Sequence, residues 1–261
     1  MATLRVMSAN LRCEVPGTTP GDPDHWGDRL PAVARMLKDR RPHLLGTQEL
    51  SFEQLTQLTG ALPIGRATGA GREGGSRGEH CAILHDPGRL MLRWWRQVWL
   101  SETPDLIGSR SWDSSLPRIA TIAGYAMDDV EFALANTHFD HVSELARAQG
   151  MRVLLDALPK GPVIVTGDFN CAAECSTPWE VATRAGLHDT WLSAERRGPE
   201  VDTFHGYAEP TASQPVRRID WILASEHWRT LAAEVVTDRP DGVWPSDHWP
   251  VLAELEFVPG R

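Results

Sequence analysis

Apolar runs of strand length recur along this chain and outnumber its helical segments, and this balance most constrains the fold. The spacing of apolar residues predicts strands at 4–11, 43–50, 79–86, 130–139, 162–169, 219–223 and 250–257. Helical spacing occurs at 29–40 and at 144–158. Many strands separated by few helices favour an α/β protein in which two sheets pack face to face with helices outside.

The composition is that of an ordinary globular protein. At 261 residues, with 41% hydrophobic and 23% charged residues, the chain is long enough to bury a sizeable core. No change of composition marks a second domain, so we predict one domain over residues 1–261. No apolar run approaches the length of about 18 residues that a transmembrane helix needs, so we predict no transmembrane segment.

Cysteine use and the first residues together predict a cytoplasmic protein. The opening stretch, MATLRVMSANLR, lacks the basic and apolar regions of a secretory signal. Four cysteines without a CxxC pair do not make a disulfide framework, so reduced thiols are expected. A local bridge between Cys171 and Cys175 is the alternative.

The formal net charge of −9 bears on the partners of the protein. Proteins that bind nucleic acid through nonspecific phosphate contacts are usually basic or carry a basic stripe. Here the basic residues are scattered, in short pairs such as Arg40–Arg41 and Arg217–Arg218. Nucleic acid is therefore not favoured, whereas a metal ion could neutralise both the site and a smaller phosphorylated substrate. The sequence leaves the oligomeric state open.

Polar side chains suited to phosphate or metal chemistry lie where the apolar runs end. In VIVTGDFN, Asp168 and Asn170 point the same way if the strand continues, although an Asp/Asn turn is the simpler alternative. A carboxylate in an apolar strand is costly to bury unless it is paired, hydrogen-bonded or bound to metal. The comparable positions are Asn10, Glu49, His138, Asp140, Asp220, Asp247 and His248. Gathered oxygen ligands favour Mg²⁺, with Mn²⁺ as a substitute.

Six motifs, taken in order, resemble the signature set of the endonuclease/exonuclease/phosphatase superfamily, which includes deoxyribonuclease-I-like enzymes. They are SANLR, GTQE, ANTH, VTGDFN, RRIDWIL and PSDHWPVLAELEF, and the resemblance runs from residue 4 to residue 257. The stretches WLSETPDLIGSRSWDSSLPRIAT and TFHGY are similar to a bacterial branch with poorly defined substrates. The resemblance implies a four-layered α/β sandwich with two mixed sheets, and metal-assisted attack of water on phosphorus.

The resemblance also implies roles for the residues that would hold the metal and the water. Glu49 would be the principal Mg²⁺ ligand, with Asn10 beside it and Asp247 near the metal. Asp168 would orient and deprotonate the attacking water, and Asn170 would hold that water or a phosphate oxygen.

A second group of residues would face the phosphate. His138 and His248 match the two phosphate-facing histidines, and Asp220 would orient a histidine. Arg118 matches an arginine that faces the phosphate, with a surface arginine as the alternative. The chemistry is consistent, because a metal ion and an imidazolium both stabilise charge that develops on phosphoryl oxygens.

Three further substrate-binding candidates rest on weaker patterns. Arg72 lies in the glycine-rich segment 67–80, which we predict to be a mobile loop that could close over a substrate anion. A solvated loop charge is the alternative for this residue. Trp112 and His205 could line the pocket, although most tryptophans in a chain with eleven of them are packing groups.

These observations predict a Mg²⁺-dependent phosphoric ester hydrolase that cleaves a monoester or diester of a small or soluble substrate. A nuclease, either an endonuclease or a deadenylase-like exonuclease, is the main alternative. A sphingomyelinase-like lipid phosphodiesterase is disfavoured because the sequence has no evident apolar hairpin for docking to a membrane. A catalytically silent binding module is disfavoured because every metal and water-activating position is retained.

Overall fold

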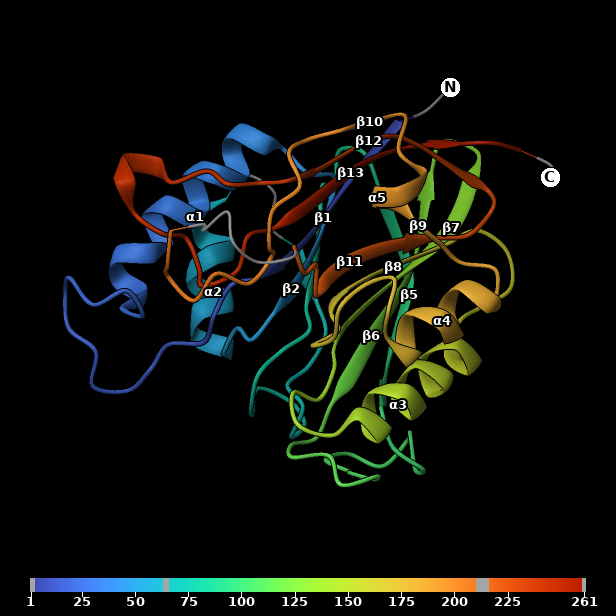
Figure 1. The fold of residues 1–261 in the computed structure, drawn as a ribbon, viewed down its shortest axis with the longest axis horizontal. Helices are drawn as coiled ribbons and strands as arrows, with labels where there is room; N and C mark the ends of the chain where they lie inside the picture. The colour runs from blue at the N-terminus through green and yellow to red at the C-terminus, as the bar shows by residue number, and fades with distance from the viewer. Residues whose placement is uncertain (1–2, 63–65, 210–215, 260–261) are drawn as a thin grey trace.

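Two β-sheets pack face to face in the computed structural model, which describes residues 3–62, 66–209 and 216–259. The helices are α1 (Trp26–Arg40), α2 (Phe52–Ala61), α3 (Glu144–Ala157), α4 (Thr177–Arg184), α5 (Thr190–Ser193) and the 3₁₀ helix η1 (Pro240–Gly242). Figure 1 shows α1 and α2 on one side of the strands, and α3 and α4 on the other. This arrangement confirms the predicted four-layered α/β sandwich.

Both sheets are mixed, as the resemblance implies. The seven-stranded sheet has the order β10 (Arg196–Arg197), β12 (Trp228–Val235), β13 (Val251–Phe257), β1 (Thr3–Asn10), β2 (Leu44–Gln48), β4 (Ile83–His85) and β3 (Arg66–Thr68). The six-stranded sheet has the order β5 (Met91–Trp99), β6 (Ile119–Met127), β7 (Val130–His138), β8 (Val163–Asp168), β11 (Asp220–Ala224) and β9 (His188–Asp189).

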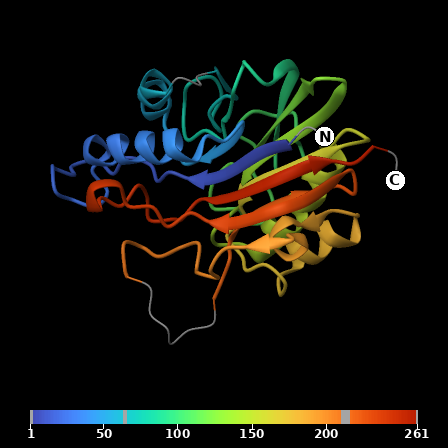
Figure 2. The ribbon, with the colours of Figure 1, turned by 90° about the horizontal axis from the view of Figure 1, so that it is seen from above.

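Each sheet contains a parallel pair of strands that are joined through a helix. β1 and β2 are parallel with α1 between them in the chain, and β7 and β8 are parallel with α3 between them. The carboxyl ends of parallel strands lie at the same edge of a sheet. β13 runs antiparallel to β1, so its amino end reaches this edge as well. Figure 2 shows these two strands, blue and red, side by side although they come from opposite ends of the chain.

Apolar side chains form three layers of core. Leu4 and Val6 of β1 belong to the cluster between the sheets, whereas Met7 belongs to the cluster beneath α1 and α2. On the other side, Met151 and Leu154 of α3 pack on the outer face of the six-stranded sheet. Central strands are therefore covered on both faces, which explains why their sequences are continuously apolar.

The apolar spacing does not predict α2, β5 or β12. β5 is an edge strand with mostly exposed residues, so its sequence lacks a regular alternation. α2 begins with a capping box formed by Ser51 and Gln54, which is the sequence signal that could have identified it. The helix predicted at 29–40 begins at Trp26, and the strand predicted at 79–86 shortens to Ile83–His85.

The cysteines and the helices bear on two further predictions. All four cysteines are unpaired, so the alternative bridge between Cys171 and Cys175 is not formed. Within the described ranges, none of the helices has the length and apolar character needed to cross a bilayer. A cytoplasmic location stays a prediction.

A buried polar network joins the two sheets directly below the ends of β2 and β7. The Asn136 side chain accepts hydrogen bonds from Gln48 Nε2 at 2.7 Å and Thr166 Oγ1 at 3.0 Å. Its amide nitrogen donates to the carbonyl oxygens of Thr47 at 2.8 Å and Ala82 at 3.0 Å. Both polar atoms of the Asn136 side chain are thus paired across the sheets, and these bonds hold the two sheets together at this point.

Gly46 lets the sheets approach at this network, and replacing it gives the first prediction. A Cβ atom at Gly46 would lie 2.3 Å from Thr166 Oγ1 and 2.5 Å from Asn136 Oδ1. We therefore expect Gly46→Ala to lower the free energy of unfolding by roughly 1–3 kcal/mol, as overpacking of a buried site does. Urea denaturation of the two proteins measures the difference.

Gly60→Ala is the matched control for this prediction. Gly60 is exposed in α2, and nothing lies within 4 Å of the position that a Cβ would take. This change should raise the free energy of unfolding by about 0.5–1 kcal/mol, because alanine favours the helix. Equal stability of Gly46→Ala and the parent protein would contradict the proposed close approach.

Candidate active site

The predicted site residues meet at one edge of the sandwich, where strands of both sheets end. Asn10 is the last residue of β1 and Glu49 follows β2, in the seven-stranded sheet. His138 and Asp168 are the last residues of β7 and β8 and are paired across the six-stranded sheet. Asp220 begins β11 opposite Asp168. The two parallel pairs therefore deliver these side chains to one place.

Asp168 lies at the centre of the cluster and is buried, with 1% of its surface exposed. Asn10 Nδ2 donates to Asp168 Oδ2 and to Glu49 Oε1, each at 2.9 Å, and so links the two carboxylates. The same Asp168 oxygen lies 3.4 Å from His138 Nε2 and 3.8 Å from His248 Nε2. Burial and the nearby Asp220 carboxylate raise the pKa of Asp168, as befits a group that accepts a proton near neutral pH.

His248 forms a buried pair with Asp220. Its Nδ1 lies 3.0 Å from Asp220 Oδ2, within hydrogen-bonding distance. Burial alone would lower the pKa of His248, but the carboxylates of Asp220 and Asp168 outweigh it and raise this pKa. The ring is therefore an imidazolium at neutral pH, with Nδ1–H donated to Asp220 and Nε2–H toward Asp168.

His138 differs from His248 in its protonation state. Burial and the positive charge of Arg118 lower its pKa well below the ordinary value, so the ring is neutral. The two histidines beside Asp168 therefore differ in charge. A neutral imidazole can accept or relay a proton, whereas an imidazolium can only donate one.

Glu49 and Asp247 lie on the other side of the cluster, around an arginine that the sequence analysis did not select. Arg12 Nη1 lies 3.7 Å from Glu49 Oε2, and Arg12 Nε lies 3.7 Å from Asp247 Oδ2. Burial raises the pKa of Asp247. An arginine two residues after Asn10, within the motif SANLR, was the available signal for this residue.

Backbone strain gathers at the same place. Arg12, Glu49 and Asn170 all have φ values in the left-handed region, at 51°, 69° and 51°. Such conformations cost roughly 1–3 kcal/mol each and persist where the surroundings hold them. Asn170 is held by its own N–H, which donates to Asp168 Oδ1, and by Nδ2, which donates to the carbonyl of Phe139.

Arg72 and Arg118 lie beside the cluster. Together with Glu49 and His138 they line a cavity of about 10 Å³ that also includes Glu79. Arg72 Nη1 donates to Glu79 Oε2 at 2.7 Å, within a glycine-rich segment that is tied by its own backbone hydrogen bonds. Arg118 is 6% exposed, and its Nε has no hydrogen-bond partner. Its Nε lies 3.9 Å from Asp140 Oδ2 and its Nη2 lies 3.0 Å from His141 Nδ1, so among the described residues the Nη1 group has no contact of this kind and can bind a phosphate oxygen.

Trp112 is not brought to the cluster by the contacts of the described residues, whereas His205 lies beside Asp247 and His248 at the edge of the cluster. His205 packs against both Trp244 and Trp249, with ring centroids at 4.4 Å and 4.3 Å, and its backbone N–H donates to the carbonyl of Asp247. It therefore supports the backbone of Asp247. The carbonyl of Trp112 accepts a hydrogen bond from Ser143 at the start of α3.

Asp140 binds the backbone and hydroxyl groups of the loops around it. One carboxylate oxygen accepts hydrogen bonds from the backbone N–H groups of Val142 and Ser143, and the other accepts from Ser115. These bonds outweigh the effect of burial and lower the pKa of Asp140. Asp140 therefore organises the loop after β7.

The donor atoms at the cluster fit a hard divalent cation. Glu49, His138 and Asp168 present ligand atoms within 4.8 Å of one another, and so do Asp168, Asp220 and His248. Asp220 Oδ1 is buried without a hydrogen-bond partner. Carboxylate oxygens, such as those of Glu49 and Asp168, suit Mg²⁺ or Mn²⁺, whereas the protonated ring of His248 offers no lone pair to a metal. Asn10 Oδ1 accepts from the N–H of Arg12, so its predicted role as a metal ligand stays a prediction.

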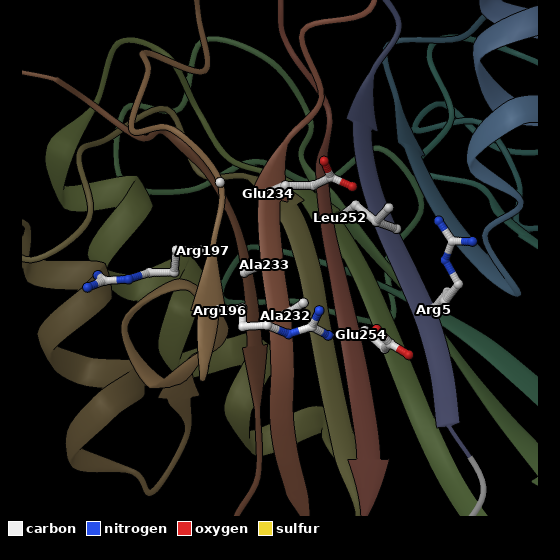
Figure 3. A pocket seen from close by; sticks show the side chains of 9 residues that line it. Arg5, Arg196, Arg197, Ala232, Ala233, Glu234, Leu252 and Glu254 are labelled. Carbon is white, nitrogen blue, oxygen red and sulfur yellow. Dashed lines mark ion pairs between the residues drawn. The ribbon is translucent and has the colours of Figure 1, made fainter.

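A larger pocket lies elsewhere, on the outer face of the seven-stranded sheet (Figure 3). It has a volume of about 380 Å³ and includes Arg196, whose Nη2 lies 3.8 Å from Glu254 Oε2. None of the predicted site residues lines this pocket. The chemistry therefore points to the strand ends and not to the larger hollow.

The structure is a two-sheet sandwich with an acidic, histidine-containing edge where strands of both sheets end. The model of the Endonuclease/Exonuclease/phosphatase family matches residues 7–248, and the chain belongs to this family. No curated protein sequence matches it.

Solved structures agree with this assignment. An endonuclease/exonuclease/phosphatase from Bacteroides vulgatus is 29% identical, with a TM-score of 0.91 over 99% of this chain and 100% of that one. A mannosyl-6-phosphatase from Bacteroides thetaiotaomicron is 32% identical, with a TM-score of 0.88 over 97% of this chain and 100% of that one. The human Nocturnin catalytic domain with bound sulfate, at 21% identity, shares the fold with a TM-score of 0.73 over 98% and 95% of the chains.

The charge of His248 gives a pH-dependent prediction. Asp220→Asn removes the carboxylate that raises the pKa of His248, while burial continues to lower it. The pKa of His248 should therefore fall, and the imidazolium should be lost at a lower pH than in the parent protein. NMR titration of the histidine rings measures this shift directly, with Asp129→Asn in the exposed turn before β7 as control. An unchanged His248 pKa in Asp220→Asn would contradict the pairing.

Proposed function

We propose that this chain is a divalent-metal-dependent phosphoesterase that uses water to hydrolyse a small phosphorylated substrate. The observation that carries the proposal is the buried Asp168, placed between a neutral His138 and a charged His248. This arrangement provides a proton acceptor and a proton donor around one point, as hydrolysis at phosphorus requires.

The side chains have separate roles in this reaction. Asp168 takes a proton from the attacking water, and its raised pKa suits that task. His248 directs Nε2–H toward the phosphoryl oxygens and stabilises the negative charge that grows on them. Asp220 keeps His248 protonated and fixes the orientation of its ring. Asn170 holds the water or a phosphate oxygen beside Asp168.

Glu49 is the proposed principal metal ligand, with Asn10 and Asp247 next to it. Burial alone would raise the pKa of Glu49, but hydrogen bonds from Asn10 and from the N–H of Cys13 lower it, so Glu49 is an anion. A bound Mg²⁺ would neutralise phosphate charge and polarise the phosphorus–oxygen bonds.

The substrate we propose is a phosphate monoester of a sugar or another small molecule. The mannosyl-6-phosphatase is 32% identical over 97% of this chain, which supports a sugar phosphate. The net charge of −9 opposes the long-range attraction that a polyanion such as nucleic acid would need. Arg118 brings a positive charge to the cavity beside Glu49 and His138, while the charge of Arg72 is shared with Glu79, and a guanidinium at this place supports the binding of a phosphate oxygen.

A substrate panel with and without metal tests this proposal. Substrates are a sugar 6-phosphate, a generic phosphodiester, single-stranded and duplex nucleic acid, and sphingomyelin, each with Mg²⁺, Mn²⁺ or a chelator. Asp168→Asn and Glu49→Ala should each lower kcat/KM by about 10²–10⁴-fold, because one loses the base and the other the metal ligand. The preferred substrate then identifies the class of ester.

Asp156→Asn is the matched control for the panel, because Asp156 is exposed on α3. It should keep full activity. Activity that persists unchanged in Asp168→Asn, or in the presence of chelator, would overturn the proposed mechanism.

Arg118→Gln tests the phosphate-binding role. The change removes the charge but keeps most of the volume of this buried side chain, so KM should rise by roughly 10–100-fold, the cost of about 1.5–3 kcal/mol for a lost charge-assisted hydrogen bond. Steady-state kinetics measures this, with Arg184→Gln on the exposed face of α4 as control. A change in kcat alone would mean that Arg118 acts elsewhere than in substrate binding.

A further inference from the structure

Arg12 lies among three carboxylates next to the candidate metal site. Its guanidinium is surrounded by three carboxylates, with Nε 3.1 Å from Asp24 Oδ1 and 3.7 Å from Asp247 Oδ2, and Nη1 3.7 Å from Glu49 Oε2. We infer that Arg12 is a built-in cation of this site, which replaces a second divalent ion and limits the site to one metal. This inference rests on the proposed metal-dependent function.

The backbone of Arg12 is fixed from several directions. Its φ of 51° is in the left-handed region, and its N–H donates to Asn10 Oδ1 at 3.0 Å. Its carbonyl oxygen accepts hydrogen bonds from Arg29 Nη2 at 3.0 Å and from Gln54 Nε2 at 3.1 Å. Arg29 is itself buried, with 1% of its surface exposed. A residue held in a strained conformation by buried partners is placed by the fold and does not drift with solvent.

The side chain is anchored at its far end as well. Asp24 Oδ1, which accepts from Arg12 Nε, also accepts from the hydroxyl of Tyr207 at 2.9 Å. Tyr207, which holds Asp24 in this way, comes from a distant part of the chain. An ordinary surface ion pair would be free to open, because its two side chains are otherwise unrestrained.

The two oxygens of Glu49 have different neighbours. Oε1 accepts from Asn10 Nδ2 on the side of Asp168, where a metal ion would bind. Oε2 accepts from the N–H of Cys13 at 3.1 Å and faces Arg12. Asp247 Oδ2 also faces Arg12. Two-metal sites place their ions about 3.5–4 Å apart. A carboxylate that bridged two such ions would need both of its oxygens, but Glu49 Oε2 already accepts from the N–H of Cys13 and faces Arg12.

Counting bound Mn²⁺ tests this inference without measuring activity. Isothermal titration calorimetry should find one Mn²⁺ per chain in the parent protein. Arg12→Gln removes the charge and leaves Glu49, Asp24 and Asp247 around the vacated position, so the count should rise to two. Arg12→Lys keeps the charge and should bind one. Arg35→Gln, on the exposed side of α1, is the control and should also bind one.

The possible counts separate this inference from the proposed function. Two equivalents in the parent protein, or one in a folded Arg12→Gln variant, would overturn the role of Arg12 and leave a metal-dependent enzyme in place. No saturable Mn²⁺ binding in the parent protein would overturn the metal-dependent function itself. If circular dichroism shows that Arg12→Gln does not fold, the count in the parent protein decides, with one in favour and two against.

Discussion

Repulsion between buried carboxylates is the constraint on which this site depends. Glu49, Asp168, Asp220 and Asp247 converge at one edge of the sandwich, where little water screens their charges. The chain offsets part of the repulsion with its own groups: the Asn10 amide between two of them, His248 beside two, and the Arg12 guanidinium beside another pair. The hard cation proposed at Glu49 and Asp168 would offset the repulsion that remains.

The charges that offset this repulsion also set the protonation states of the two histidines. The same carboxylates that repel one another keep His248 protonated, while the positive charge of Arg118 helps to keep His138 neutral. Two identical side chains, one on each side of Asp168, thus acquire different charge states from their neighbours alone. In the proposed mechanism the charged His248 stabilises the phosphoryl oxygens, while Asp168 takes the proton.

The site is accurate because the scaffold beneath it is rigid. The Asn136 network joins the sheets directly beneath the site. Asn136 precedes His138 by two residues, and its partner Gln48 precedes Glu49 by one. On the other side, Thr203 Oγ1 accepts from the N–H of Asp220, and the carbonyl of Thr203 accepts from the N–H of Trp249, which follows His248. Hydrogen bonds of this kind, between segments distant in sequence, hold reacting groups within the small tolerances that catalysis requires.

The sequence by itself determined the layers of the fold and most of the cluster. Continuous apolar runs predict strands, and these runs end in Asn10, Glu49, His138 and Asp168. Because the strands of each parallel pair run in the same direction, their end residues meet at one edge of the sandwich. Exposed elements such as β5 escaped prediction, since an edge strand has no face that must be apolar. The tertiary structure alone decided the rest. The charge of each histidine, the placing of His205 behind Asp247 and the position of Arg12 among three carboxylates depend on contacts between distant segments. Local sequence does not encode burial, the hydrogen-bond partners of a side chain or the sign of a neighbouring charge, and these three together set the pKa values at this site.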